Sequence, residues 1–124
     1  AKLMGLLNTV EAKLKDSFPS VYDHLVEHDF TTGAAFSPLF ITLYIYQIEH
    51  QHAMRIFESF ILEGEQALLR VLYKMIALKQ KSILTKEEIE LISYLRTDMI
   101  NECITEFGVE TLLEHEEGPA GGKR

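Results

Sequence analysis

The sequence predicts an all-α fold, and three observations support this prediction. Apolar residues recur at spacings of three and four along nearly the whole chain, which is the period of an amphipathic helix. No run alternates strictly between apolar and polar residues with a composition typical of strands. The 124 residues are 47% hydrophobic, which is enough to fill the core of one domain. We therefore expect a bundle of about six or seven helices.

The first helices are marked by their apolar stripe and by proline. Leucine and valine share one face of residues 2–15, which predicts an amphipathic helix there. Pro19 suits the first position of a second, shorter helix over 19–27. The turn and cap residues of 29–33 then predict a loop.

The middle of the chain predicts two further helices. Ser37 as N-cap and Pro38 at the first helical position predict the start of a helix that runs to about Ile48. Because this segment is apolar on almost all sides, we expect it to be the central buried helix. A turn follows, and the next apolar stripe predicts a helix from His52 to the glycine at Gly64.

The C-terminal half predicts helices on both sides of a polar connection. An apolar stripe predicts a helix over 65–79, and the polar residues 79–82 are expected to form a loop after it. Thr85 and Glu88 have the spacing of a capping box, which predicts a new helix that continues to Gly108.

One more turn of helix is expected over 109–113, and the end of the chain is expected to be a tail. Residues 118–124 are rich in glycine and predict a flexible segment. The predicted organisation is therefore one helical domain over 1–117 followed by a tail over 118–124.

Composition narrows the classes of function. The chain carries 12 Lys and Arg against 19 Asp and Glu, a net charge of −7, which argues against nucleic acid as a partner. Cys103 has no cysteine with which to pair, so a reducing, cytoplasmic compartment is predicted. The longest apolar stretch is about half a membrane span, so we expect no transmembrane segment.

The sharpest short motif is His24-Leu25-Val26-Glu27-His28, which matches the His-x-x-Glu-His pattern of inverted zinc metallopeptidases. Two histidines four residues apart share a helix face and can bind one zinc, with the glutamate as base. Glu102 and Glu106 are conceivable third ligands. Those enzymes have larger α/β folds, and three fixed positions arise easily by chance, so ordinary histidines at a helix end are the favoured interpretation.

Other candidates favour a structural interpretation. His50 and His52 are expected in a solvated loop, and Cys103 is expected to be buried and inert. Several aromatic residues could line a ligand pocket but are expected in the core: Phe36, Phe40, Tyr44, Tyr46, Phe57 and Phe60. No phosphate-binding loop is present. We therefore predict no catalytic residue, no cofactor and no metal site.

Several spaced features, in one order along roughly ninety residues, resemble the C-terminal half of a TBC domain, the module of Rab GTPase-activating proteins. Residues 18–25, Phe-Pro-Ser-Val-Tyr-Asp-His-Leu, are similar to the family's Pro, aromatic, His-Leu segment. Residues 36–44 resemble its Trp-Phe-Leu-Thr-Leu-Phe helix, with leucine at the tryptophan position. Residues 54–58, Met-Arg-Ile-Phe-Glu, resemble its Leu-Arg-Ile-Trp-Asp run. The Glu-Gly pair at 63–64 and the helix from 65 continue the match.

The resemblance implies an activator of a GTP-bound Rab. In this family an arginine and a glutamine enter the GTPase site, from Ile-x-x-Asp-x-x-Arg and Tyr-x-Gln motifs in the N-terminal half. Neither motif occurs in this sequence. The resemblance assigns Arg55 to a structural role, and we expect it to pair with a carboxylate such as Glu58. Neither Arg55 nor Arg70 is expected to act as the arginine finger.

The expected function is therefore that of a fragment or truncated chain. It would be part of a Rab GTPase activator, catalytically silent alone, cytoplasmic and peripheral to endomembranes. Its expected partner is a Rab-type GTPase, and a homo-oligomer through a face exposed by truncation is also expected. The first alternative is a non-catalytic helical protein-interaction module. The second, less favoured alternative is a zinc metallopeptidase-like protein.

Overall fold

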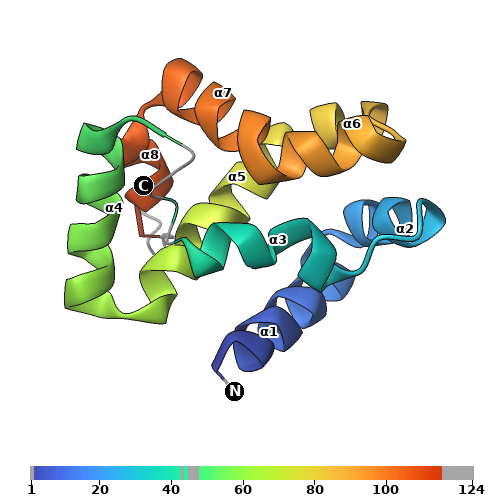
Figure 1. Ribbon diagram of the computed structural model, residues 1–124, viewed down its shortest axis with the longest axis horizontal. Helices are drawn as coiled ribbons and strands as arrows, with labels where there is room; N and C mark the ends of the chain where they lie inside the picture. The colour runs from blue at the N-terminus through green and yellow to red at the C-terminus, as the bar shows by residue number, and fades with distance from the viewer. Residues whose placement is uncertain (1, 43, 45–47, 116–124) are drawn as a thin grey trace, which may run out of the picture.

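The computed structural model describes residues 2–42, 44 and 48–115, and the described part of the chain is all-helical, as the sequence predicts (Figure 1). Because α6, the π-helical segment η1 and α7 follow one another without a break, the described residues form seven helical rods. The predicted tail over 118–124 lies outside the described residues. The elements, in order, are α1 (Lys2–Ser17), α2 (Pro19–Glu27), α3 (Thr32–Ile41), α4 (His50–Glu63), α5 (Glu65–Thr85), α6 (Glu88–Ser93), η1 (Tyr94–Asp98), α7 (Met99–Phe107) and α8 (Val109–Leu113).

Helix α5 is the central element. It contacts α2, α4, α7 and α8, and Figure 1 shows it passing through the middle of the molecule. The sequence predicts this position for the helix that starts at residue 37. The correction follows from burial, because α3 buries five side chains and α5 buries nine: Ala67, Leu68, Leu69, Val71, Leu72, Met75, Ile76, Lys79 and Ile83.

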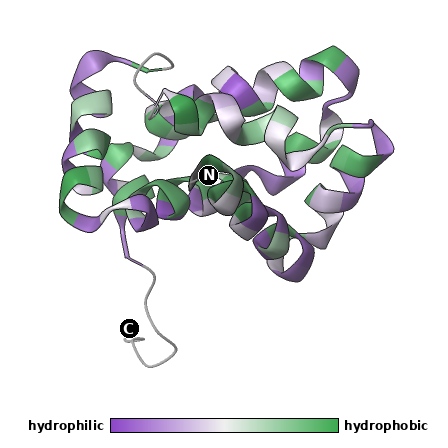
Figure 2. Cartoon of the chain, turned by 60° about the horizontal axis from the view of Figure 1, so that its bottom comes forward, coloured by the Kyte–Doolittle hydropathy of each residue, from purple (hydrophilic) through white to green (hydrophobic). Residues whose placement is uncertain are grey.

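Helices α1 and α2 cover the core from the N-terminal side. The α1 side chains Leu7, Val10 and Leu14 are buried, and α1 packs against α2 and α3. Hydrophobic and hydrophilic residues both occur along each of these helices (Figure 2). The apolar stripe that predicts the first helix is therefore the face that enters the core.

The N-cap of helix α3 lies six residues earlier than the N-cap predicted at Ser37. Its N-cap is Thr31, whose hydroxyl oxygen accepts a hydrogen bond of 3.0 Å from the backbone N–H of Ala34. Pro38 lies inside the helix, and the helix ends at Ile41. The prediction was wrong because Ser-Pro is a common helix start, whereas here an earlier cap starts the helix. Part of the predicted extension to Ile48, residues 43 and 45–47, lies outside the described residues.

Pro38 leaves a backbone carbonyl without its usual helical partner, and Arg96 supplies one. Proline has no N–H, so the carbonyl of Ala34, four residues earlier, loses its intrahelical donor. Arg96 in η1 donates to this oxygen from Nε at 3.1 Å and from Nη2 at 2.8 Å. The proline therefore ties α3 to η1 through a single guanidinium.

Helix α5 continues through the polar stretch that was predicted to be a connection. Lys79 has non-helical dihedrals, φ −114° and ψ 18°, so the helix is kinked there but continues to Thr85. The predicted capping box is also absent. The Thr85 hydroxyl donates to the carbonyl of Ser82 at 2.7 Å, and the N-cap of α6 is Glu87.

The C-terminal helices follow the prediction at their ends. Gly108 ends α7 with φ 89°, a conformation that glycine adopts at little cost, and α8 is the predicted final turn. None of the described helices is both long and apolar enough to cross a membrane.

The bond from Arg96 to Ala34 predicts a coupling between Arg96 and Pro38. Arg96→Met should lower the free energy of unfolding by about 1 kcal/mol, because one carbonyl loses its donor. In a Pro38→Ala background the loss should be smaller, since the N–H that this substitution introduces can bond the same carbonyl. Urea unfolding of the four chains of this double-mutant cycle measures the coupling. Equal losses in both backgrounds would contradict the assignment.

Candidate functional site

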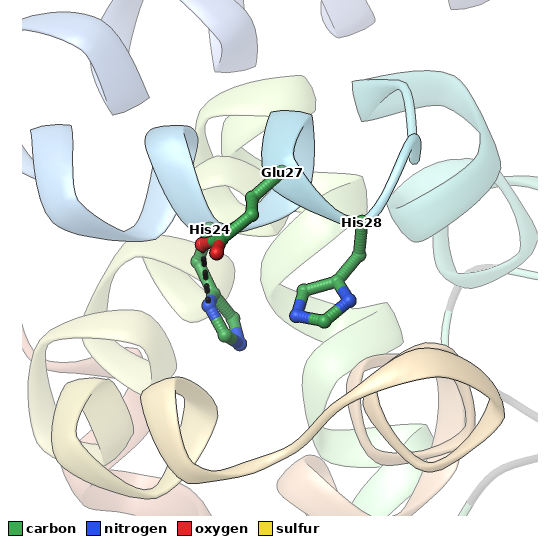
Figure 3. Close-up of side chains that lie close together, drawn as sticks. All are labelled: His24, Glu27 and His28. Atoms are coloured by element: carbon green, nitrogen blue, oxygen red, sulfur yellow. Dashed lines mark ion pairs between the residues drawn. The ribbon is translucent and has the colours of Figure 1, made fainter.

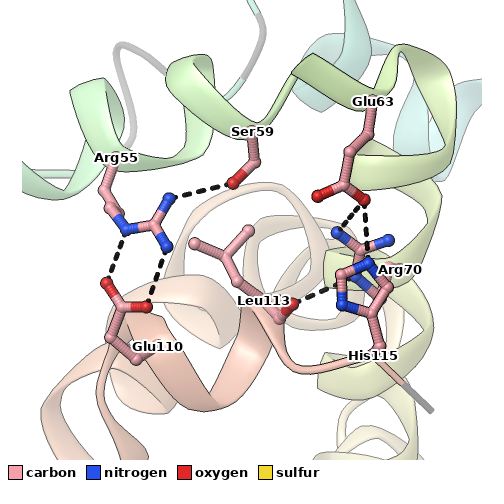
Figure 4. A network of polar contacts seen from close by, with 7 residues as sticks. All are labelled: Arg55, Ser59, Glu63, Arg70, Glu110, Leu113 and His115. Atoms are coloured by element: carbon pink, nitrogen blue, oxygen red, sulfur yellow. Dashed lines mark hydrogen bonds and ion pairs between the residues drawn. The ribbon is translucent and has the colours of Figure 1, made fainter. Parts of the chain in front are cut away.

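Arg55, Glu63 and Arg70, three of the residues that carry the family resemblance, lie in a polar network where α4, α5 and α8 meet (Figure 4). Arg55 comes from α4 and Arg70 from α5, while Glu110 comes from α8. Gly64, with φ 76°, makes the sharp turn between α4 and α5. This turn folds the two helices together, so that their arginines face the same short helix α8.

Arg55 joins α4 to α8. Its Nε lies 2.6 Å from Glu110 Oε2 and its Nη2 lies 3.0 Å from Glu110 Oε1, so the pair is bidentate. A third nitrogen, Nη1, donates to Ser59 Oγ at 3.0 Å. The predicted partner Glu58 is present but distant, 3.9 Å from Nη1. The expected structural ion pair of Arg55 is confirmed, and its main partner is Glu110.

Arg70 joins α5 to both α4 and the end of α8. Its Nη2 lies 2.7 Å from Glu63 Oε1, and its Nε donates to the backbone carbonyl of Leu113 at 3.1 Å. His115 Nε2 lies 3.1 Å from the same Glu63 oxygen. The hydrogen bond from Arg70 lowers the pKa of Glu63, and its charge adds to the effect. The side chain of Arg70 is only 15% exposed.

A second polar cluster surrounds Lys79 on the other half of α5. Lys79 Nζ lies 2.9 Å from Glu106 Oε1 and 3.1 Å from Glu102 Oε1, and Tyr94 donates to Glu102 at 2.8 Å. Burial lowers the pKa of Lys79, but the hydrogen bonds to the two glutamates outweigh it, so the pKa is raised. Glu102 and Glu106, considered as third zinc ligands from the sequence, instead hold this lysine.

The histidine motif lies at the end of α2, and its three polar side chains converge (Figure 3). The rings of His24 and His28 are edge to face, with centroids 4.7 Å apart. His24 Nδ1 lies 4.0 Å from Glu27 Oε1. One potential ligand atom from each of the three residues lies within 4.8 Å of the others. The spacing of the motif therefore brings the three side chains close together at the end of α2. The sequence favours ordinary histidines at a helix end.

The remaining candidates are structural. Cys103 is fully buried, and burial raises its pKa to about 11, so the thiol is protonated at neutral pH and inert, as predicted. His50 and His52 were expected in a loop but form the first turn of α4. The helix begins at His50, with Glu49 as its N-cap, two residues before the start at His52 that the apolar stripe indicates.

The aromatic residues are divided between the core and a surface hollow. Phe36, Phe40 and Tyr44 are buried, and the Tyr44 hydroxyl donates to the carbonyl of Leu68 at 3.1 Å. Phe40 also lines an apolar hollow of about 500 Å³, together with Leu3, Leu6, Ile41 and Phe60. Core packing therefore accounts for Phe36, Phe40 and Tyr44, while Tyr46 lies outside the described residues.

The polar contacts of the arginines hold helices in place and do not orient a group for reaction. All three arginines of the described part, Arg55, Arg70 and Arg96, donate hydrogen bonds to groups of the same chain. Sequence reasoning missed Glu110 and Ala34 as their partners because both lie more than fifty residues away in the chain. The proline at position 38 was the one local signal that a carbonyl would need an external donor.

Comparisons with known proteins agree with the resemblance. A family model described as the RabGAP TBC domain matches residues 1–120. The chain is also similar to the GTPase-activating protein GYP5 of Saccharomyces cerevisiae, with 22% identity over 99 residues. This alignment covers 80% of the chain and 11% of GYP5, so the chain spans a small part of that relative. No solved structure matches the chain.

The bond between Arg70 and Glu63 predicts a pH dependence. The pKa of Glu63 should lie below its ordinary value of 4.5, and Arg70→Met should return it toward that value. Because the folded-state pKa is lowered, the stabilisation is present above about pH 4.5 and is lost as the pH falls through the folded-state value. NMR titration of the Glu63 carboxyl carbon measures the shift. Lys74→Met, which removes a charge from the same helix, should leave the Glu63 pKa unchanged. An Arg70→Met chain whose Glu63 titrates as in the parent would contradict the assignment.

Proposed function

The chain belongs to the RabGAP TBC domain family, and we propose that it is part of a GTPase-activating protein for Rab-type small GTPases. It corresponds to the C-terminal half of the TBC domain, forms the helical scaffold of that half and contributes part of the GTPase-binding surface. The complete activator works in the cytoplasm, peripheral to endomembranes. The chain alone is catalytically silent.

The observation that supports this proposal most directly is that the described arginines bond to groups of the same chain. An activator supplies a free arginine that reaches the charge developing on the transferred phosphoryl group. Arg55 and Arg70, which match the family's motifs, are both bonded to groups of the same chain. The Ile-x-x-Asp-x-x-Arg and Tyr-x-Gln motifs are also absent from the sequence. The finger residues must therefore come from another part of the activator.

An apolar hollow on the surface also supports a contact with another part of the domain. The apolar hollow of about 500 Å³ lies between α1, α3 and the junction of α4 with α5. Ile41 at its edge is 65% exposed. A mainly apolar hollow with an exposed isoleucine at its edge can receive an apolar side chain of another protein element. We propose that the N-terminal half of the TBC domain covers this face.

GTP hydrolysis across a panel of Rab proteins tests the proposed function. The isolated chain should leave each Rab at its intrinsic rate, since it lacks the finger residues. A version extended upstream to include both finger motifs should stimulate its target Rab by about a thousandfold or more. Replacing the finger arginine of the extended version by alanine is the matched control and should abolish the stimulation.

Two outcomes would contradict this proposal. Stimulation by the isolated chain would show that the finger residues lie within it. If the extended version stimulates no Rab, the activator role fails, and a non-catalytic interaction module is favoured instead.

The uncovered hollow predicts self-association of the isolated chain. Sedimentation equilibrium should show an average mass that rises with protein concentration, because two copies can cover each other's apolar face. Ile41→Glu should return the chain to a monomer, whereas Ile89→Glu, at a residue 82% exposed and outside the hollow, should not. A concentration-independent monomer mass for the unmodified chain would contradict this prediction.

A further inference from the structure

We propose that His24, Glu27 and His28 bind one zinc ion, which fastens the end of α2 to the connection between α5 and α6. One ligand atom of each residue already lies within 4.8 Å of the others. The site is independent of the proposed activator function. It also differs from the peptidase interpretation, since no hydrolytic step is involved and Glu27 is a ligand rather than a base.

The hydrogen bond that His24 makes through Nε2 leaves the lone pair of Nδ1 available to a metal. His24 Nε2 lies 2.6 Å from the backbone carbonyl of Lys86, and a carbonyl only accepts, so Nε2 carries the proton. In the neutral ring, Nδ1 then holds the lone pair. This nitrogen faces the Glu27 carboxylate across 4.0 Å, which is beyond hydrogen-bond distance. Two electron-pair donors that face each other in this way are suited to share a cation.

His28 is held in a complementary way. Its Nδ1 lies 3.2 Å from Glu88 Oε2, and an ionised carboxylate only accepts, so Nδ1 donates and Nε2 holds the lone pair. Figure 3 shows one ring nitrogen of His28 directed toward the ring of His24. Both rings are nearly buried, with side-chain exposures of 11% and 12%.

These two contacts form the outer shell that zinc-binding histidines normally have. A histidine that binds zinc usually donates its other ring N–H to a carbonyl or a carboxylate, which fixes the ring and its tautomer. Lys86 supplies the carbonyl and Glu88 the carboxylate. Both come from the start of α6 and the residues just before it, although the ligands are on α2. A bound ion would therefore join two segments about sixty residues apart in sequence.

The charges around the site favour a divalent cation. Glu27 and Glu88 add negative charge, and their side chains are 75% and 80% exposed. Lys86, whose carbonyl contacts His24, has its ammonium group 5.1 Å from the centre of the Tyr94 ring, where it makes a separate contact. Two neutral imidazoles and one carboxylate are a ligand set of zinc, with a water in the fourth position.

Only small movements complete the coordination. Two donors on a tetrahedral zinc lie about 3.3 Å apart, given metal–ligand distances near 2.0 Å. The largest separation in the cluster, 4.8 Å, therefore has to shorten by about 1.5 Å. The exposed Glu27 side chain can rotate toward the rings. His28 is the C-cap of α2, and its backbone N–H is held by the carbonyls of His24 and Leu25, so the movement falls on the side chains.

Zinc titration of the untagged chain tests this proposal. Isothermal calorimetry should give one zinc per chain, and zinc should raise the melting temperature. His28→Ala should abolish the stoichiometric binding and the rise in melting temperature. Glu27→Gln should weaken the affinity at least tenfold. His52→Ala removes a histidine that bonds neither ring and should bind zinc as the unmodified chain does.

Circular dichroism first establishes that each variant is helical, so that lost binding is not confused with lost folding. His28→Ala removes a nearly buried ring, whereas Glu27→Gln changes only an exposed carboxylate and should leave the fold intact. The proposal is overturned if the unmodified chain takes up no stoichiometric zinc. It is equally overturned if His28→Ala binds as the parent does, or if His52→Ala loses as much affinity as His28→Ala.

Discussion

The need to cover α5 organises this molecule. A long helix with a wide apolar face is stable only when other elements remove those side chains from water. Helices α2, α4, α7 and α8 supply that cover, and α1 packs on α2 and α3 outside them. Short connections such as the one at Gly64 follow from this requirement, because α4 must fold back along the helix that comes next. The covering helices are amphipathic for the same reason, because their apolar faces pack on α5 and their polar faces remain in water.

Several polar contacts between helices also involve α5 or its C-cap. Lys79 joins it to α7, and Arg70 joins it to α4 and α8. His24 joins α2 to the carbonyl of Lys86, the residue that caps α5. Hydrophobic burial is non-directional and leaves helices free to slide, whereas a hydrogen bond fixes a distance and an angle. The apolar core therefore holds the covering helices on α5, and the charged contacts set their register along it.

Local patterns predicted the helical class and most helix ends, but they failed wherever the deciding partner is distant in sequence. Lys79 looked like part of a polar loop because its glutamates lie on α7. Pro38 looked like a helix start because the guanidinium that compensates for it comes from η1. In the candidate site, the spacing of His24 and His28 was visible in the sequence. The contacts that fix their ring nitrogens were not, because Lys86 and Glu88 belong to a segment brought there only by packing on α2.

The pairing of cationic side chains within the chain also bears on the proposed role beside a GTPase. Bound GTP presents a highly charged triphosphate, and its hydrolysis needs cationic groups that are free to approach it. In the described part, Arg55, Arg70 and Lys79 are committed to carboxylates or carbonyls of this chain. The net charge of −7 leaves a long-range field that repels a triphosphate rather than attracting it. Under the proposed function, such a scaffold orients helices next to a GTPase, and a segment outside these residues supplies the charge that acts on the phosphate.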